Sequence, residues 1–225
     1  MITILKKQLW VPGRRHKKPN PKPNFLIPGH LYLRRRISLP NGDIEFDSGW
    51  DESKSFLKIY AQHIFCAFGH ADVASVLDTT NTARTLQRPA DGANVFMNAT
   101  APNDDDAYGL LVGDQASPTA VDITDYALQS KIAHGTGAGQ LDYEVMAVDS
   151  FATDSTSAQF EFRRNYINSS SDSGTITVTE IVLAVQSVTV GSTTNHALIR
   201  DVLSSGDAIA HNRVYTVEYT YKITE

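Results

Sequence analysis

The chain has 225 residues, of which 41% are hydrophobic, and its mean hydropathy of −0.24 is typical of a soluble globular protein. Its single cysteine, Cys66, excludes an internal disulfide and a cysteine-based metal cluster. The most apolar stretch, residues 59–77, is interrupted by His63, His70 and Asp72, so we predict no membrane-spanning segment.

The net charge of −5 is distributed unevenly along the chain. Residues 1–42 hold ten basic residues and no acidic residue, so the rest of the chain carries ten basic and 25 acidic residues, a net −15. A charge block of this kind is typical of an interaction arm, and we predict that its basic side chains bind a partner. They are Lys6, Lys7, Arg14, Arg15, Lys17, Lys18, Lys22, Arg34, Arg35 and Arg36.

Residues 1–30 are predicted to form an extended basic arm. Residues 12–28 contain five of the nine prolines, which remove backbone hydrogen-bond donors and favour an extended conformation. Such a segment becomes ordered only against a partner. The expected partner is either a neighbouring subunit or nucleic acid, and a solvated tail is the alternative.

Residues 31–46 are predicted to form a β-hairpin, because Asn41-Gly42 suits a type I′ turn between two strands. One amphipathic helix is predicted near 53–69, with residues 53–68 as the helix and Gly69 as its C-terminal stop. His63 and Cys66 lie three residues apart on that helix, but two ligands do not make a metal site, and we interpret both as packing residues. The apolar residues that follow helical spacing are Phe56, Leu57, Tyr60, Ala61, Ile64, Phe65 and Phe68.

Two loops resemble ligand-binding motifs without completing them. The acidic loop at residues 103–106, with the sequence NDDD, lacks the glycine of a helix-loop-helix calcium site, so a solvated loop is the preferred interpretation. The glycine-rich residues 134–139 lack the Gly-Lys-Ser/Thr ending of a phosphate loop and precede a predicted strand. We interpret them as a flexible turn.

The C-terminal half is predicted to be wholly β. Five segments with strand character are separated by loops rich in serine, threonine, glycine and asparagine. This pattern predicts a mainly β protein, an antiparallel β-sandwich that is jelly-roll-like or immunoglobulin-like and spans residues 31–225 with the one helix embedded. The five segments are 140–148, 158–167, 175–190, 197–203 and 213–223.

Two charged residues interrupt apolar rows of these strands. Glu180 shares a strand face with Val178 and Val182, and Arg164 shares one with Phe162. A hairpin closed by residues 168–173 would place Arg164 opposite Val178 or Glu180. We therefore predict a structural ion pair between Arg164 and Glu180, with exposure at a bulge as the alternative.

Several sequence words resemble a loosely defined family of small tailed-bacteriophage virion proteins. The helix entry at Asp51, Glu52 and Ser53 departs from the family pattern, and the proline-rich arm is not part of it. The resemblance covers most of residues 45–222. Its words are DSGWDESKSFLKIY (47–60), LDTTNTARTL (77–86), the segment 108–143 that begins YGLLVGDQ, TVTEIVLAV (177–185) and LIRDVL (198–203).

The resemblance implies a structural protein of the virus particle, made in the host cytoplasm and located in the virion, with no cofactor. A capsid decoration, connector or tail protein would assemble as a homo-oligomer and contact other virion proteins. The charge of the arm would match an acidic capsid surface or packaged DNA.

Two other functions remain open at this stage. One is a DNA-contacting capsid shell protein; the other is a receptor-binding or carbohydrate-binding module that uses Trp50 and the tyrosines of the last strand. An enzyme is not expected, because the seven histidines are scattered and neither HExxH nor GxSxG occurs.

Overall fold

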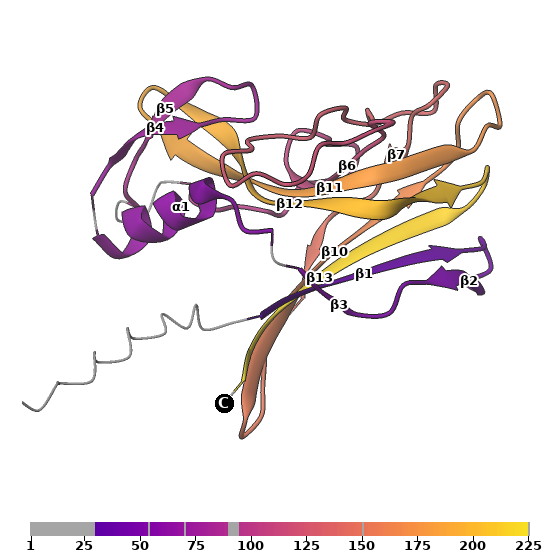
Figure 1. Cartoon of the computed structure of the whole chain (residues 1–225), viewed down its shortest axis with the longest axis horizontal. Helices are drawn as coiled ribbons and strands as arrows, with labels where there is room; N and C mark the ends of the chain where they lie inside the picture. The colour runs from indigo at the N-terminus through magenta and orange to yellow at the C-terminus, as the bar shows by residue number, and fades with distance from the viewer. Residues whose placement is uncertain (1–29, 54, 70, 90–94, 150, 225) are drawn as a thin grey trace, which may run out of the picture.

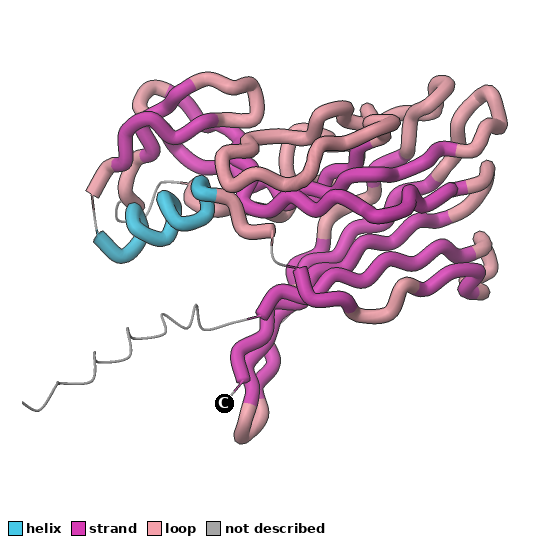
Figure 2. The backbone as a smooth tube through the Cα atoms, viewed as in Figure 1, coloured by secondary structure: helices cyan, strands magenta, loops and turns pink. Residues whose placement is uncertain are grey.

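The computed structural model describes residues 30–53, 55–69, 71–89, 95–149 and 151–224. These residues form two antiparallel sheets that face each other as a sandwich, with a helix at one end (Figure 1). Loops gather along one side of the five-stranded sheet, as Figure 2 shows. The predicted mainly β sandwich is confirmed, whereas the predicted arm lies outside the described residues apart from His30.

The larger sheet has eight strands in the order β2-β1-β13-β10-β7, with β3 paired to β1, and with β8 and β9 paired to β10. Its longest strands are the first and last of the described chain together with β10. The bounds are β1 His30–Ser38, β2 Ile44–Asp47, β3 Asp51–Ser53, β7 Asp142–Tyr143, β8 Ala147–Val148, β9 Ala152–Thr153, β10 Ser157–Ile167 and β13 Val214–Thr224.

The smaller sheet has five strands in the order β12-β11-β5-β4, with β6 paired to β11. A tight turn at Gly191, whose φ of +85° favours glycine, joins its two long strands. The bounds are β4 Val73–Leu77, β5 Ala83–Leu86, β6 Gly109–Gly113, β11 Ile176–Thr189 and β12 Ser192–Ile209, and the helix α1 is Lys58–Gly69. Within the described residues, no helix has the length and apolarity needed to cross a membrane.

The hairpin of β1 and β2 confirms the prediction for residues 31–46, but its turn differs from type I′. Gly42 has a φ of +92°, whereas Asn41 does not have a positive φ, and the Gly42 N–H donates to the Leu39 carbonyl at 2.9 Å. Residues 40–42 therefore form a three-residue hairpin loop, in which a turn is followed by a left-handed residue. The Asn-Gly pair therefore predicted the position of the turn correctly, but the predicted turn type was wrong.

Helix α1 begins at Lys58 and not at Ser53, because residues 51–53 pair with β1 as strand β3. Its buried residues are Ile59, His63 and Cys66, whereas Phe65 and Phe68 of the predicted apolar face are exposed. The packing interpretation of His63 and Cys66 is thus confirmed.

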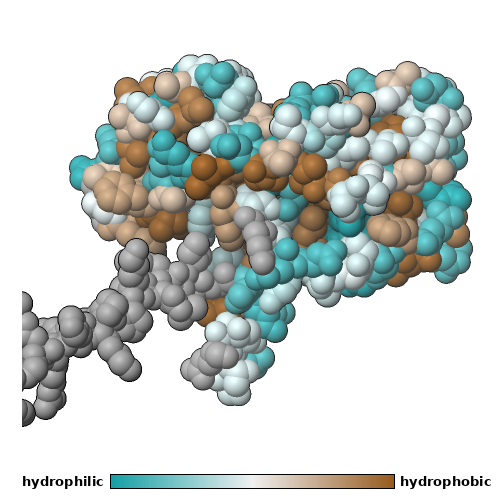
Figure 3. All heavy atoms as spheres, in the orientation of Figure 1, coloured by the Kyte–Doolittle hydropathy of each residue, from teal (hydrophilic) through white to brown (hydrophobic). Residues whose placement is uncertain are grey.

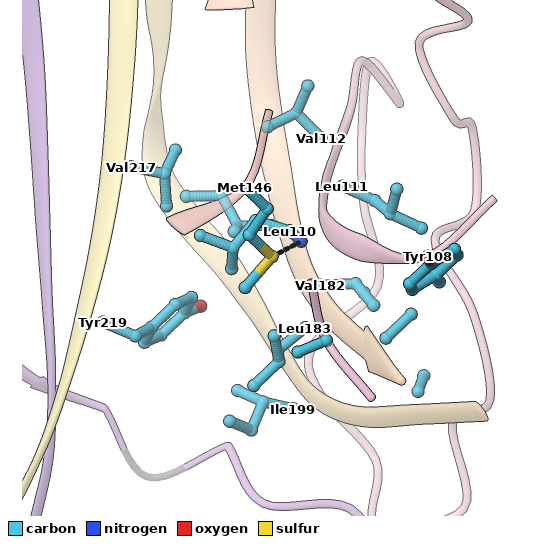
Figure 4. Packing of buried hydrophobic residues seen from close by; sticks show 14 of the residues in the cluster. Tyr108, Leu110, Leu111, Val112, Met146, Val182, Leu183, Ile199, Val217 and Tyr219 are labelled. Carbon is cyan, nitrogen blue, oxygen red and sulfur yellow. Dashed lines mark hydrogen bonds between the residues drawn. The ribbon is translucent and has the colours of Figure 1, made fainter. Parts of the chain in front are cut away.

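The core fills the space between the sheets (Figure 4). Leu110 and Leu183 of the smaller sheet lie on one side and Tyr219 of the larger sheet on the other, and Met146 packs between them. The Leu110 N–H contacts the Met146 sulfur at 3.1 Å. Gly109, with a φ of +86°, leaves room for this sulfur, since a Cβ there would lie 2.8 Å from it.

The predicted Arg164–Glu180 ion pair is wrong, although both side chains are fully buried. Residues 168–173 do not close a hairpin: they carry the chain from one sheet to the other. Arg164 of β10 lies opposite Val217 of β13, whereas Glu180 of β11 lies opposite Val202 of β12. The two charges belong to different sheets, and each has other partners.

Arg164 is held by backbone carbonyl groups. Its Nε donates to the Glu144 oxygen at 2.7 Å, and its Nη2 donates to the Asp105 oxygen at 2.6 Å. The guanidinium also lies over the Tyr143 ring, 4.8 Å from the centroid. The remaining acceptors are the carbonyl oxygens of Pro102, Tyr108 and Leu110, each at 3.2 Å.

Glu180 pairs with Arg200 of the neighbouring strand β12, which is also fully buried. The other Glu180 oxygen accepts the Gln129 N–H at 2.9 Å, and Arg200 reaches the Asp125 carboxylate at 2.6 Å. This network ties the loop at residues 119–129 to the smaller sheet. Arg164, on β10, ties the segments around residues 102–110 and 144 to the larger sheet.

Candidate interaction surface

Three basic residues assigned to the arm belong to the sandwich, which corrects the prediction. Arg34 donates to Asp47 from Nε at 2.9 Å, Arg36 pairs with Glu218, and Arg35 holds both oxygens of Asp207 at 2.8 and 2.7 Å. Alternation along β1 sends Arg35 inward, where it meets β12 of the other sheet. Each charge already has a carboxylate partner, so Arg34, Arg35 and Arg36 do not form a free basic patch.

The other seven basic residues of the predicted arm lie outside the described residues. Residues 1–29 carry these seven charges and no acidic residue, so residues 30–225 carry 13 basic and 25 acidic residues, a net −12. The two parts of the chain are therefore opposite in charge. The seven are Lys6, Lys7, Arg14, Arg15, Lys17, Lys18 and Lys22.

An apolar groove of about 250 Å³ opens between α1 and the two sheets. The ends of β10 and β13 project away from the smaller sheet on the side of α1, which leaves the space between the sheets open there (Figure 1). Hydrophobic side chains appear along the seam between the sheets in Figure 3. The lining includes Leu31, Phe56, Tyr60, Ile64, Phe160, Phe162, Leu183 and Tyr221.

Aromatic rings from both layers form the walls of this groove. Phe56 and Tyr60 lie 4.5 Å apart between ring centroids, and Phe160 and Tyr221 lie 5.4 Å apart. Burial, together with the neighbouring Tyr221, raises the pKa of Tyr60 to about 12, so its hydroxyl stays neutral at physiological pH. The groove is therefore uncharged as well as apolar.

The wall formed by α1 continues onto the protein surface. Tyr60, Ile64 and Phe68 follow one another at a spacing of four residues, which places them along one side of a helix. Phe68 is 84% exposed, and Phe65 on an adjacent face is 60% exposed. Two exposed phenylalanines beside an open apolar groove are typical of a surface that a partner covers.

On the buried face of α1, His63 packs against His196 of β12. The rings of His63 and His196 lie 5.1 Å apart. The His63 Nδ1–H donates to the Ile59 carbonyl at 2.9 Å, and within the described residues the buried Nε2 has no hydrogen-bond partner. Burial lowers the pKa of His63 to about 4, so the ring is neutral at physiological pH.

Asp104, His134 and Asp142 place three ligand-type atoms within 4.8 Å of one another. The Tyr143 N–H donates to His134 Nδ1 at 3.2 Å, so the ring proton sits on Nε2, which faces Asp104 at 3.7 Å. A metal would need a free lone pair on Nε2. The contacts instead fit an imidazole that accepts the Tyr143 N–H and turns its Nε2 proton toward the Asp104 carboxylate.

Asp105 and Asp106 of the acidic loop bind other parts of the protein, whereas we predicted a solvated loop. Asp106 accepts the His134 N–H at 2.8 Å and pairs with Lys131 at 2.9 Å. Asp105 accepts the Ala107 N–H at 2.7 Å, and its carbonyl binds Arg164. These carboxylates stabilise the loop that Arg164 anchors.

Neither the apolar groove nor the anchoring arginine networks were predicted. The predicted helix already placed Tyr60, Ile64 and Phe68 on its apolar stripe, but the sequence did not show that this part of the stripe borders an open groove. Comparisons with protein-family models, with curated proteins and with solved structures each find no match to this chain. Its function is therefore argued from the surfaces described above.

Proposed function

We propose that the protein is a structural component of a bacteriophage particle, such as a capsid decoration, connector or tail protein, that assembles through contacts between its own copies. The observation that carries this proposal is the open apolar groove with its extension along α1 to Phe68. The resemblance of the sequence to small virion proteins supports the same role. Such proteins function by covering each other's surfaces rather than by chemistry.

The groove has the properties of a protein-binding surface. Its aromatic walls, with Phe160 and Tyr221 on one side and Tyr60 on the other, offer the apolar contact area that interface cores use. Burying such area stabilises a complex by about 25 cal/mol per Å² before the costs of association. Phe68 gives the same surface a large side chain that is almost fully available to a partner.

The occupant we propose is the N-terminal segment of a second copy. Strand β1 begins at His30, and Leu31 lines the groove, so the chain enters the fold at the edge of this surface. The preceding 29 residues contain apolar clusters at 2–5, 9–11 and 25–27. Fully extended, they would reach up to about 100 Å, which is enough to contact a neighbour.

Charge complementarity favours the same arrangement. The seven basic residues before His30 face a body with a net charge of −12. A basic segment of one copy is attracted to the acidic body of another, and this attraction weakens as salt rises. In β1, each of the three arginines is paired with a carboxylate, so these arginines do not repel the basic segment of another copy. They are Arg34, Arg35 and Arg36.

The first experiment measures self-association by light scattering for the full chain, for a deletion of residues 1–27 and for Phe68→Asp. We expect an oligomer for the full chain and monomers for both variants. The control, Ile44→Asp, alters a side chain that is 54% exposed on β2, opposite Ser38 and thus at the other end of β1 from the groove residue Leu31, and should leave the oligomer intact. A full chain that stays monomeric at all concentrations would overturn assembly through its own copies.

The second experiment searches for the protein by mass spectrometry in purified particles of the phage that encodes it. Its presence at a stoichiometry above that of host contaminants is expected, and its absence would overturn the virion role. A gel-shift assay at moderate salt tests the alternative of a DNA-contacting shell protein. Salt-sensitive DNA binding that disappears with residues 1–27 would favour that alternative.

A further inference from the structure

A second groove, of about 330 Å³, lies on the outer face of the larger sheet. Tyr32 of β1, Thr220 of β13 and Glu161 of β10 form one row across three paired strands. Residues on one sheet face recur with a period of two, so the next row brings Lys222 and Gln159 to the same face. Trp50, from the segment between β2 and β3, forms a further part of the lining together with Thr224.

The aromatic part of this groove is exposed and held in place. Trp50 is 44% exposed, and the guanidinium of Arg34 lies 5.6 Å from the centroid of its ring. Arg34 is itself fixed by Asp47, with 2.9 Å between Nε and the carboxylate. The indole therefore has a restricted orientation, which lowers the entropy lost when a ligand packs against it.

The polar part of the groove has unused hydrogen-bonding capacity. Within the described residues, the Gln159 amide and the Lys222 ammonium group have no side-chain hydrogen bond or ion pair. Among the described residues, the Thr220 hydroxyl is the one side chain that donates a hydrogen bond to Glu161, at 3.5 Å, and burial together with nearby Glu218 raises the pKa of the Glu161 carboxyl. Two donors and one acceptor thus surround a space bounded by aromatic rings.

The combination of groups selects a ligand class. One ammonium group and one carboxylate balance each other in the lining, which favours an uncharged ligand. The Glu161 carboxylate disfavours a nucleic-acid backbone, and the polar side chains of the two rows disfavour an apolar peptide. A sugar ring has an apolar C–H face for Trp50 or Tyr32 and hydroxyl groups for Gln159 and Lys222.

We propose that this groove binds a neutral oligosaccharide. Its volume lies at the small end of ligand pockets, which span about 300–1,000 Å³, so a short stretch of a longer glycan would occupy it. This groove is distinct from the apolar groove, because the two share no lining residue and lie on opposite faces of the larger sheet.

The test begins with an array of neutral oligosaccharides built from glucose, galactose, mannose and N-acetylhexosamines. The chain has two tryptophans, so in a Trp10→Phe background the fluorescence reports Trp50 alone. We expect at least one array glycan to bind and to change this emission on titration. Trp50→Ala and Tyr32→Ala, compared in the unaltered chain by calorimetry, should each weaken binding at least tenfold.

Two further variants keep the test decisive if the aromatic replacements affect folding. Gln159→Ala and Lys222→Met remove groups with no partner in the described residues, so they should fold normally and weaken binding several-fold. Ile123→Ser, which alters a side chain that is 64% exposed outside this groove, is the control and should bind like the unaltered protein. No binding by any array glycan, or equal affinity in the Trp50, Gln159 and Lys222 variants, would overturn the proposal.

Discussion

Strand β10 places two opposite environments on the same face. Phe160 and Phe162 line the open apolar groove, whereas Arg164 and Tyr166, two and four residues further on, are completely buried. All four alternate inward along one strand. The difference arises from what covers them: loops close the sandwich over Arg164, and nothing described covers the groove.

The comparison shows that inward direction and burial are separate properties. Polar anchors hold the loops that cover the sandwich: Arg164 binds five backbone carbonyls from the larger sheet, and Arg200 binds two carboxylates on the loop-covered face of the smaller sheet. Apolar side chains line the part that stays open. We infer that anchoring loops needs directional hydrogen bonds, whereas a surface reserved for a partner needs only shape and apolar area.

The largest expected effect comes from Arg164→Met. It removes the guanidinium that donates to five carbonyl oxygens, in two buried and three partly buried hydrogen bonds, and we expect the free energy of unfolding to fall by about 4–5 kcal/mol in urea titrations. The control is Arg163→Met on the same strand, whose exposed contact with Asp149 at 3.5 Å should contribute less than about 1 kcal/mol. A loss for Arg164→Met no larger than the control would mean that the loops are held by other contacts.

Arg200→Met should cost slightly less, about 3–4 kcal/mol, because it leaves the buried Glu180 carboxylate unpaired. Unlike the carbonyl partners of Arg164, this partner can be removed by mutation. The double variant Arg200→Met, Glu180→Leu should therefore recover at least half of the loss by the same measurement. Additive losses in the double variant would contradict a compensating pair.

The pH dependence of stability tests how α1, one wall of the groove, is attached. Burial lowers the pKa of His63 from 6.5 to about 4, so the unfolded chain binds more protons between these values. Stability should be complete above pH 6.5 and fall by up to about 3 kcal/mol as pH drops toward 4. His63→Leu should flatten this part of the profile in urea titrations at each pH; an unchanged profile would assign the dependence to other groups.

The smallest effect on stability is expected for Phe68→Ser, which alters the exposed end of the apolar groove wall on α1. The side chain is 84% exposed, so the free energy of unfolding should change by less than about 0.5 kcal/mol. Phe162→Ser, deeper in the same groove, should cost about 2 kcal/mol because its ring packs against the core. Equal losses in thermal unfolding would show that the groove wall is uniform from the surface inward.

Much of the larger architecture could be predicted from local patterns. The hairpin around Gly42 and the long strands of the C-terminal half follow from turn residues and from alternation with a period of two. The same alternation predicted that Arg164 and Glu180 are buried, and both are, but Glu180 faces the loop at residues 119–129 and not the larger sheet. The candidate grooves were out of reach, because each joins side chains from elements far apart in the sequence.

Alternation predicts the direction of a side chain, but it contains no information about the strand that lies opposite. A hairpin between β10 and β11 was the simplest pairing, yet the chain changes sheets after Ile167, where buried Asn168 donates to the carbonyls of Gly174 and Ile209. Arg164 then faces backbone carbonyls, Glu180 faces Arg200, and Arg35 crosses to Asp207. The residue pattern therefore determines which groups are buried in this protein, and the packing of the two sheets determines which groups they meet.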